Sequence, residues 1–259
     1  MLLTDLSAHP VIAHRGNSAH APENTFPAYD EALTLGADAL EFDVRLTRDG
    51  VPVVIHDPSV DRTTNGHGFV TSFDLAELRR LDAGARFSVD GGRTFPFRGQ
   101  GLVVPALEEM LTRYRHTPLL IEVKIPHAVE ATRRLLERFG AMERTLVDST
   151  DHAAVAPFRG GSLATGASLA DVLRLIPSAL MGCAPRSLPY VALCIPRRYN
   201  GIPVPVSRLA RAARAVGSVT HVWTVNDPKA ARRLWRQGIQ GIITDDPGPM
   251  LQARVEGGL

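Results

Sequence analysis

The chain has 259 residues, 44% of them hydrophobic, which is enough for one large domain or two small ones. Its 29 lysine and arginine residues against 27 aspartate and glutamate residues give a formal net charge of +2, so bulk charge supports neither a nucleic-acid nor a membrane-surface partner. No run approaches the roughly 20 apolar residues of a membrane span, and no secretory signal is visible. We therefore expect a cytoplasmic protein without stable membrane insertion.

Short apolar runs alternate with helical patterns along the chain. The pattern predicts eight strands, at residues 11–14, 39–44, 119–124, 145–149, 163–167, 190–195, 221–225 and 241–244. It also predicts helices at residues 24–35, 105–114, 127–139, 152–159, 170–176, 206–216, 227–237 and 247–254. Apolar strands that are each followed by a helix indicate a parallel sheet covered by helices.

Eight such units in about 250 residues predict an α/β fold, the (β/α)8 TIM barrel. The alternative is a doubly wound open sheet. It is weakened because no glycine-rich phosphate loop follows the first strand. We therefore predict a single TIM-barrel domain over residues 1–259.

One segment interrupts the alternation of strands and helices. A turn signal at residues 48–50 lies between two strand-like runs, and it is too short for a parallel crossover, so it predicts a hairpin. Such a hairpin sets His56 roughly opposite Asp43 at the barrel mouth. Residues from about 50 to 103 would then form a small insertion after the second strand.

Three carboxylates stand at the predicted C-terminal ends of neighbouring strands. Glu41 and Asp43 are two residues apart, so they share one face of their strand, and Glu122 ends the next barrel strand. Oxygen ligands of this kind predict one divalent cation, Mg²⁺ or Ca²⁺. The alternative is that the three acids pair with nearby basic residues, namely Arg15, Arg45 and Lys124.

Two histidines end apolar runs that lead to the same mouth. His14 and His56 can supply a general acid and a general base, although the sequence does not assign the two roles. Arg15 and Lys124 are expected to neutralise a phosphate group. Lys124 is one of only two lysines in the chain, which favours a need for a compact charge at that position.

Other polar and aromatic residues have two interpretations each. Trp223 can form an apolar wall for a substrate or pack in the core. Glu23 and Asn24 can begin a helix or contact the substrate. Asp245 and Asp246 are expected to cap the last helix.

These residues lie in a longer series of motifs that resembles the glycerophosphodiester phosphodiesterase family. The matching pieces run in family order over nearly the whole chain. They are HRG (14–16), APENT (21–25), EFDVRLTRDGVPVVIHD (41–57), DRTTNGHG (61–68), AELRRLDAG (76–84), VPALEEML (104–111), IEVK (121–124), VWTVND (222–227) and GIITDDP (241–247). HRG alone would be weak, but the complete series is very specific.

The resemblance implies a (β/α)8 barrel that hydrolyses glycerophosphodiesters to glycerol 3-phosphate and an alcohol, with a small-molecule substrate. By this resemblance, the cation is held at the positions of Glu41, Asp43 and Glu122. The residues His14 and His56 match the acid and base. Phosphate contacts match Arg15 and Lys124.

The chain departs from the family pattern after the fourth strand. The family commonly has a Ser-Phe pair there, whereas this chain has Val147-Asp148-Ser149-Thr150. The missing aromatic residue predicts a different shape of the alcohol-side pocket. Asp148 would then join the cation ligands or bind a positive headgroup.

Two further functions fit the same residues. A lysophospholipase D or a sphingomyelinase-D-like enzyme would need an apolar rim for an acyl chain. The phenylalanines of the insertion can supply this rim, or they can form a local core; they are Phe69, Phe73, Phe87, Phe95 and Phe97. A non-catalytic phosphodiester-binding module is the rival from another class. No pattern in the sequence specifies the headgroup or the oligomeric state.

Overall fold

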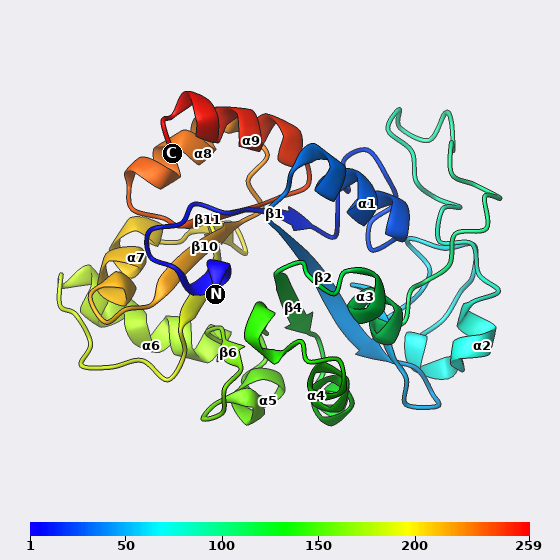
Figure 1. Cartoon of the computed structure of the whole chain (residues 1–259), viewed down its shortest axis with the longest axis horizontal. Helices are drawn as coiled ribbons and strands as arrows, with labels where there is room; N and C mark the ends of the chain where they lie inside the picture. The colour runs from blue at the N-terminus through cyan, green and yellow to red at the C-terminus, as the bar shows by residue number, and fades with distance from the viewer.

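Eight parallel strands form the wall of a barrel in the computed structural model, which describes residues 1–259 (Figure 1). The strands are β1 (Val11–His14), β2 (Ala39–Leu46), β4 (Leu119–Val123), β5 (Thr145–Asp148), β6 (Ala164–Thr165), β7 (Ala192–Pro196), β10 (Val219–Trp223) and β11 (Gly241–Thr244). They lie in the order β6-β5-β4-β2-β1-β11-β10-β7. A parallel bridge from Gly166 to Ala192 joins the two ends, so the barrel is nearly closed and the predicted fold class is confirmed.

Helices surround this barrel as an outer ring (Figure 1). They are α1 (Phe26–Leu35), α3 (Leu107–Arg113), α4 (Val129–Arg138), α5 (His152–Val155), α6 (Leu169–Leu180), α7 (Val206–Arg214), α8 (Pro228–Arg236) and α9 (Pro247–Glu256). Short 3-10 turns are η1 (Leu2–Thr4), η3 (Pro126–Ala128), η4 (Met142–Arg144) and η5 (Ala156–Phe158). Each barrel strand is thus followed by a helix, as the sequence pattern predicts.

Helix α6 is longer than predicted. The sequence pattern ends at residue 176, just before Pro177, but the helix continues through this proline to Leu180. Proline removes one backbone N–H, which leaves the carbonyl of Leu173 without its helical partner. Leu173 is 58% exposed, so we infer that water can satisfy that carbonyl at little cost.

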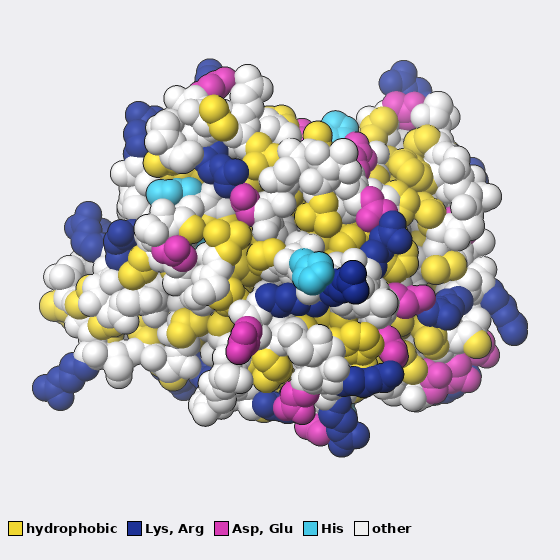
Figure 2. Space-filling view, viewed as in Figure 1, with side chains coloured by type: hydrophobic (Ala, Val, Ile, Leu, Met, Phe, Trp, Pro, Cys, Tyr) yellow, Lys and Arg dark blue, Asp and Glu magenta, His cyan; other side chains and the backbone are white.

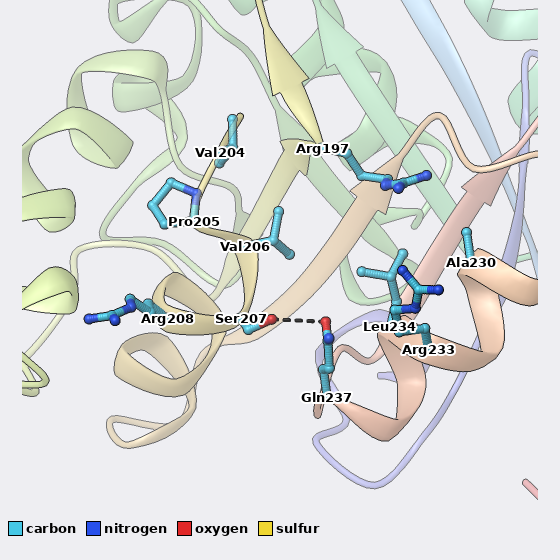
Figure 3. A pocket seen from close by; sticks show the side chains of 10 residues that line it. All are labelled: Arg197, Val204, Pro205, Val206, Ser207, Arg208, Ala230, Arg233, Leu234 and Gln237. Atoms are coloured by element: carbon cyan, nitrogen blue, oxygen red, sulfur yellow. Dashed lines mark hydrogen bonds between the residues drawn. The ribbon is translucent and has the colours of Figure 1, made fainter. Parts of the chain in front are cut away.

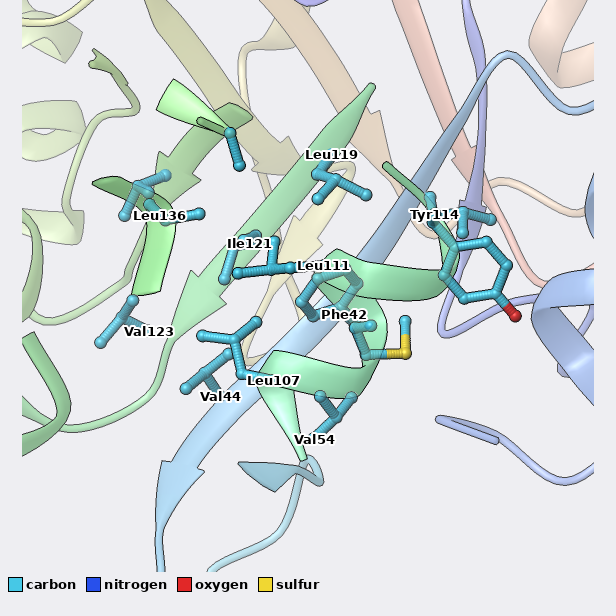
Figure 4. Packing of buried hydrophobic residues seen from close by; sticks show 14 of the residues in the cluster. Phe42, Val44, Val54, Leu107, Leu111, Tyr114, Leu119, Ile121, Val123 and Leu136 are labelled. Carbon is cyan, nitrogen blue, oxygen red and sulfur yellow. The ribbon is translucent and has the colours of Figure 1, made fainter. Parts of the chain in front are cut away.

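Two hydrophobic layers hold the barrel together. The inner layer includes Ile12, Leu120 and Ile243, which come from β1, β4 and β11 and are almost completely buried. The outer layer packs strands against helices: Phe42 and Ile121 lie among residues of α3 and α4 (Figure 4). Because successive strand residues face opposite sides, each strand contributes to both layers.

The N-terminal segment closes one end of the barrel. Leu3 in η1 is completely buried and belongs to the inner hydrophobic layer, and this turn lies near the middle of the barrel in Figure 1. Its carbonyl oxygen is 2.9 Å from Nε2 of the buried His221. Burial lowers the pKa of His221 to about 4, so its imidazole is neutral at neutral pH. The opposite end of the barrel stays open for the site.

The predicted hairpin is present, with a small shift in register. Strand β3 (Pro52–Val54) pairs antiparallel with β2, and Val44 lies opposite Val54. Asp43 is therefore opposite Ile55 rather than His56, one residue from the expected position. The turn still returns His56 to the mouth of the barrel, where it lines the same cavity as Glu41.

After this hairpin the chain forms the segment on the right of Figure 1, with η2 (Val70–Ser72) and α2 (Leu75–Leu78). A separate hydrophobic cluster lies under it, built around Val60, Val70 and Leu78. A separate short hairpin, formed by β8 (Arg198–Tyr199) and β9 (Ile202–Pro203), lies in the loop between β7 and α7. The segment after β2 thus packs on its own small core as well as on the barrel.

The surface carries mixed charge. On the face shown in Figure 2, basic and acidic side chains are scattered over the periphery, and basic side chains also flank a histidine near the middle. None of the helices has both the length and the apolar character needed to cross a membrane.

Candidate active site

A cavity of about 250 Å³ lies at the open end of the barrel. Its titratable lining residues are His14, Arg15, Glu41, His56, Glu122, Lys124 and Asp148. In a (β/α)8 barrel the C-terminal ends of the strands and the loops after them form the active site. The side chains that the sequence singles out therefore converge at the expected end.

Glu41 and Glu122 line this cavity, and the buried Asp43 completes the group of three predicted carboxylates. Glu41, Asp43 and Glu122 each offer an oxygen, and these oxygens lie within 4.8 Å of one another. Strands β2 and β4 are parallel neighbours whose register sets Asp43 beside Glu122. Glu41 and Asp43 are buried, with exposed fractions of 5% and 0%.

Two basic side chains compensate part of this negative charge. Arg15 Nε is 3.1 Å from Asp43 Oδ2, and Lys124 Nζ is 2.9 Å from Asp43 Oδ1. Lys124 Nζ also lies 2.6 Å from Glu122 Oε2. Ion pairing, the alternative to a cation site, is thus present for Arg15 and Lys124. Arg45 does not take part, because its Nε donates to the carbonyl oxygen of His56 at 2.7 Å.

The positive charges of Arg15 and Lys124 stabilise mainly the Asp43 carboxylate, and Glu41 has weaker partners. Its Oε2 accepts a hydrogen bond from the backbone N–H of Arg15 at 3.1 Å. Burial, and then the charge of Asp43, raises the pKa of Glu41. Although burial favours its neutral form, Lys124 and Arg15 lower the pKa of Asp43. A further positive charge or a proton is needed for Glu41, and the oxygen-only donor set fits Mg²⁺ or Ca²⁺.

His14 has a carboxylate partner on the side away from the acidic cluster. Its Nδ1 lies 2.6 Å from Asp245 Oδ1, and its Nε2 lies 4.0 Å from Glu41 Oε2. Asp245 also accepts hydrogen bonds from Ser18 at 3.1 Å and Asn226 at 2.7 Å. The prediction that Asp245 caps the last helix is therefore wrong, because its carboxylate is held at the barrel mouth.

His56 has the same arrangement with a different acid. Its Nδ1 lies 2.6 Å from Asp57 Oδ1, and Arg62 Nε donates to Asp57 Oδ2 at 2.6 Å. Each histidine thus has Nδ1 anchored by a carboxylate, which fixes the ring and leaves Nε2 for chemistry. Sequence reasoning missed Asp57 and Arg62 as functional residues. The sequence does place both residues in family motifs: Asp57 ends the motif at residues 41–57, and Arg62 lies in the motif at residues 61–68.

The two histidines differ in their affinity for a proton. Burial opposes the charged form of His14, but Glu41 and Asp245 raise its pKa above the ordinary value. Burial lowers the pKa of His56, and the attraction of Asp43 does not offset this effect. Two imidazoles whose pKa values shift in opposite directions are suited to be an acid and a base.

Glu23 and Asn24 precede α1, whose N-cap residue is Thr25, and both contact charged residues at the cavity. Glu23 Oε1 lies 3.1 Å from Arg15 NH1 and accepts a hydrogen bond from Arg62 NH2 at 2.8 Å. Asn24 Nδ2 donates to Asp43 Oδ2 at 3.0 Å, and Asn24 Oδ1 accepts from Tyr29 at 2.6 Å. Both residues position charged groups of the cavity.

The backbone around these residues is strained. Arg15 and Asn24 each have φ of 57°, in the left-handed region that non-glycine residues rarely adopt. Gly16 has φ of 87°, and a Cβ atom there would lie 2.6 Å from the backbone carbon of Ala28 in α1. The glycine of the HRG motif therefore allows the loop to turn and to approach the first helix closely.

Trp223 and Asp148 complete the wall of the cavity. Trp223 ends β10, lines the cavity and also packs against the inner hydrophobic layer, so it has a core role and its contact with a substrate stays a prediction. Asp148 ends β5 beside Glu122, outside the group of three clustered carboxylates. Burial, and then the charge of Glu122, raises the pKa of Asp148 well above its usual range.

Another cavity lies away from this site, between α7 and α8 (Figure 3). Arg197, Arg208 and Arg233 are among its lining residues, and Ser207 Oγ donates to Gln237 Oε1 at 2.8 Å. No histidine, cysteine or acidic side chain lines it. It therefore lacks the acid–base and cation-binding groups that the barrel mouth contains.

The geometry at Gly16 predicts that Gly16→Ala destabilises the protein by about 2–4 kcal/mol, because it adds backbone strain and a steric clash. Gly50→Ala is the matched control. Gly50 also has positive φ, but nothing lies within 4 Å of its added Cβ, so only the strain remains, about 1 kcal/mol. Urea unfolding of both variants measures the difference, and equal losses would contradict the close approach at Gly16.

Comparisons with known proteins agree with this geometry. The sequence model of the glycerophosphoryl diester phosphodiesterase family matches residues 14–249. A glycerophosphodiester phosphodiesterase of Caldanaerobacter subterraneus subsp. tengcongensis is 34% identical over 96% of this chain and 98% of its own length. One from Bacillus altitudinis is 31% identical over 95% of this chain and 98% of its own length.

Solved structures are similar throughout the chain. The phosphodiesterase domain of a Mycobacterium tuberculosis protein has a TM-score of 0.85 over 96% of this chain and all of its own, and at 24% identity it shows the fold alone. An Oleispira antarctica phosphodiesterase in complex with the product sn-glycerol-3-phosphate has a TM-score of 0.74 and 27% identity, over 94% of this chain and 96% of its own. The family match and the full-length relatives confirm the resemblance in the motifs: the chain belongs to the glycerophosphoryl diester phosphodiesterase family.

Proposed function

We propose that this phosphodiesterase hydrolyses glycerophosphodiesters to glycerol 3-phosphate and an alcohol in a metal-dependent reaction with two catalytic histidines. The observation that carries the proposal is a cavity lined by His14, His56, Glu41 and Glu122, with the buried Asp43 completing the cluster of three carboxylates. The Oleispira antarctica relative was solved with sn-glycerol-3-phosphate as product, which supports the same product here.

Glu41, Asp43 and Glu122 are the residues that would hold the cation. When bound, a divalent cation polarises the phosphoryl group and offsets charge that develops on its oxygens. Arg15 and Lys124 line the cavity beside Asp43, so their positive charges would neutralise a phosphate group bound there. Glu23 holds Arg15 in this orientation from the other side.

The two histidines would move the protons of the reaction. One imidazole accepts a proton from the nucleophile, which is either water or the 2-hydroxyl of the glycerol group. The other imidazole donates a proton to the oxygen of the leaving alcohol. Asp245 and Asp57 keep the two rings oriented, because each carboxylate binds an Nδ1 atom at 2.6 Å.

A non-catalytic binding module has less support from the same geometry. Binding alone requires the basic residues and the cation ligands. It gives no reason for two histidines that are each anchored by a separate carboxylate and whose pKa values shift in opposite directions.

We expect His14→Ala and His56→Ala each to lower kcat/KM for glycerophosphocholine by about 10²–10⁴-fold, because each variant removes a general acid or base. The assay is the release of glycerol 3-phosphate, measured with a coupled dehydrogenase. His116→Ala is the matched control, since His116 is exposed outside the cavity and should leave the rate unchanged. Equal rates in all four proteins would refute the histidine mechanism.

We also expect one Mg²⁺ or Ca²⁺ ion to bind per chain, and Asp43→Asn to weaken this binding by at least about tenfold, because it removes a buried charged ligand. Isothermal titration calorimetry of the two proteins with each cation measures the affinity. Glu31→Gln is the control, because Glu31 is an exposed acid on α1. A chelator should stop turnover, and turnover that a chelator leaves intact would exclude the metal-dependent reaction.

A further inference from the structure

An apolar groove adjoins the catalytic cavity, and the proposed chemistry does not use it. Its volume is about 100 Å³, and 10 of its 14 lining residues are hydrophobic, which makes it chemically unlike the charged cavity beside it. The residues that give it this character are Leu169, Val172, Leu173, Ile176, Tyr199 and Val204.

The groove and the catalytic cavity are continuous. Glu122, Asp148, Thr150, Cys194 and Trp223 line both of them. A substrate whose phosphate lies among the charged residues can therefore extend one ester arm past this junction into the groove.

The elements that form the groove also expose apolar side chains to solvent. Leu173 on α6 is 58% exposed, and Tyr199 in the β8–β9 hairpin is 40% exposed. Ile202, in the same hairpin, is 69% exposed. Apolar side chains around a groove that opens into an active site are typical of a surface that binds an apolar group.

The insertion does not offer an equivalent surface. From the sequence, the phenylalanines of the insertion are candidates for an apolar rim that binds an acyl chain. None of them lines the catalytic cavity or the groove. Phe87 and Phe97 pack edge to face with ring centres 5.5 Å apart, and Phe73 packs against the cluster under the insertion. Phe69 is exposed. The apolar surface next to the chemistry is therefore the one formed by α6 and the hairpin.

We propose that the groove binds an aliphatic chain on one ester arm of the substrate, so that the preferred substrates are lysophospholipids or other glycerophosphodiesters with a single aliphatic chain. This inference rests on the proposed phosphodiester hydrolysis. Water adds to phosphorus, the bond from phosphorus to the leaving oxygen breaks, and that oxygen takes a proton. The products are a phosphomonoester and an alcohol, and the chain stays on one of the two.

The test compares two substrate series with glycerophosphocholine, which has no aliphatic chain. In lysophosphatidylcholines of increasing length the chain is on the glycerol, and in glycerophosphoalkanols it is on the leaving alcohol. All are used below their critical micelle concentrations. We expect kcat/KM to rise up to about fourfold per added methylene in one series until the groove is filled. The series that responds identifies the arm.

Two groove variants and one matched control complete the design. Leu173→Asn makes the exposed wall polar and should lower kcat/KM for the longest chain about tenfold, with no change for glycerophosphocholine. Val172→Trp fills the groove and should remove the dependence on length. Leu180→Asn is the control, because Leu180 is also an exposed leucine on α6, at 48%, but does not line the groove.

The outcomes separate this inference from the function on which it rests. If glycerophosphocholine is hydrolysed but neither series gains with length, the groove does not bind an aliphatic chain and the inference is wrong. The inference is also wrong if Leu173→Asn and Leu180→Asn behave alike on the longest chain. If no diester of any kind is hydrolysed, the proposed function itself fails.

Discussion

The burial of Glu41 and Asp43 on one face of β2 is the constraint on which the site depends. Two carboxylates removed from water repel each other and lose hydration, so they persist only with positive charge nearby. Arg15 and Lys124 supply that charge mainly to Asp43, at 3.1 and 2.9 Å, and leave Glu41 with a raised pKa. The negative charge that Arg15 and Lys124 leave uncompensated at Glu41 makes this position suitable for a divalent cation and for the phosphate that would accompany it.

The fold provides this arrangement from segments that are distant in the sequence. Barrel register sets β2 beside β4, and the β2–β3 hairpin returns His56 to the same mouth. Strained backbone at Arg15 and Asn24 turns their side chains toward Asp43, and Gly16 allows the loop to pack against α1. The last strand leads to Asp245, which holds His14. Strain and buried charge are thus concentrated where the chemistry would occur.

Much of this could be predicted from the sequence because it depends on periodicity. Apolar runs that alternate with helical patterns predict eight strands in order, and a spacing of two residues predicts that Glu41 and Asp43 share one face. Contacts between distant segments do not follow from periodicity: the sequence pattern indicates a helix cap at Asp245 and gives no role to Asp57 or Arg62. The apolar groove could not be predicted from the sequence, because it depends on how α6 packs beside the short β8–β9 hairpin. The roles of the site residues, the extent of the insertion and a cytoplasmic location stay predictions.

Proton release on cation binding tests the central claim most directly. If Glu41 carries a proton near neutral pH because of its burial beside Asp43, a bound Mg²⁺ or Ca²⁺ ion must displace it. Calorimetric titrations in buffers of different ionisation enthalpy measure the number of protons released. The account predicts release of a fraction of a proton that grows as the pH is lowered toward 6, and its loss in Glu41→Gln. Cation binding with no proton release at any pH, or unchanged release in that variant, would contradict it.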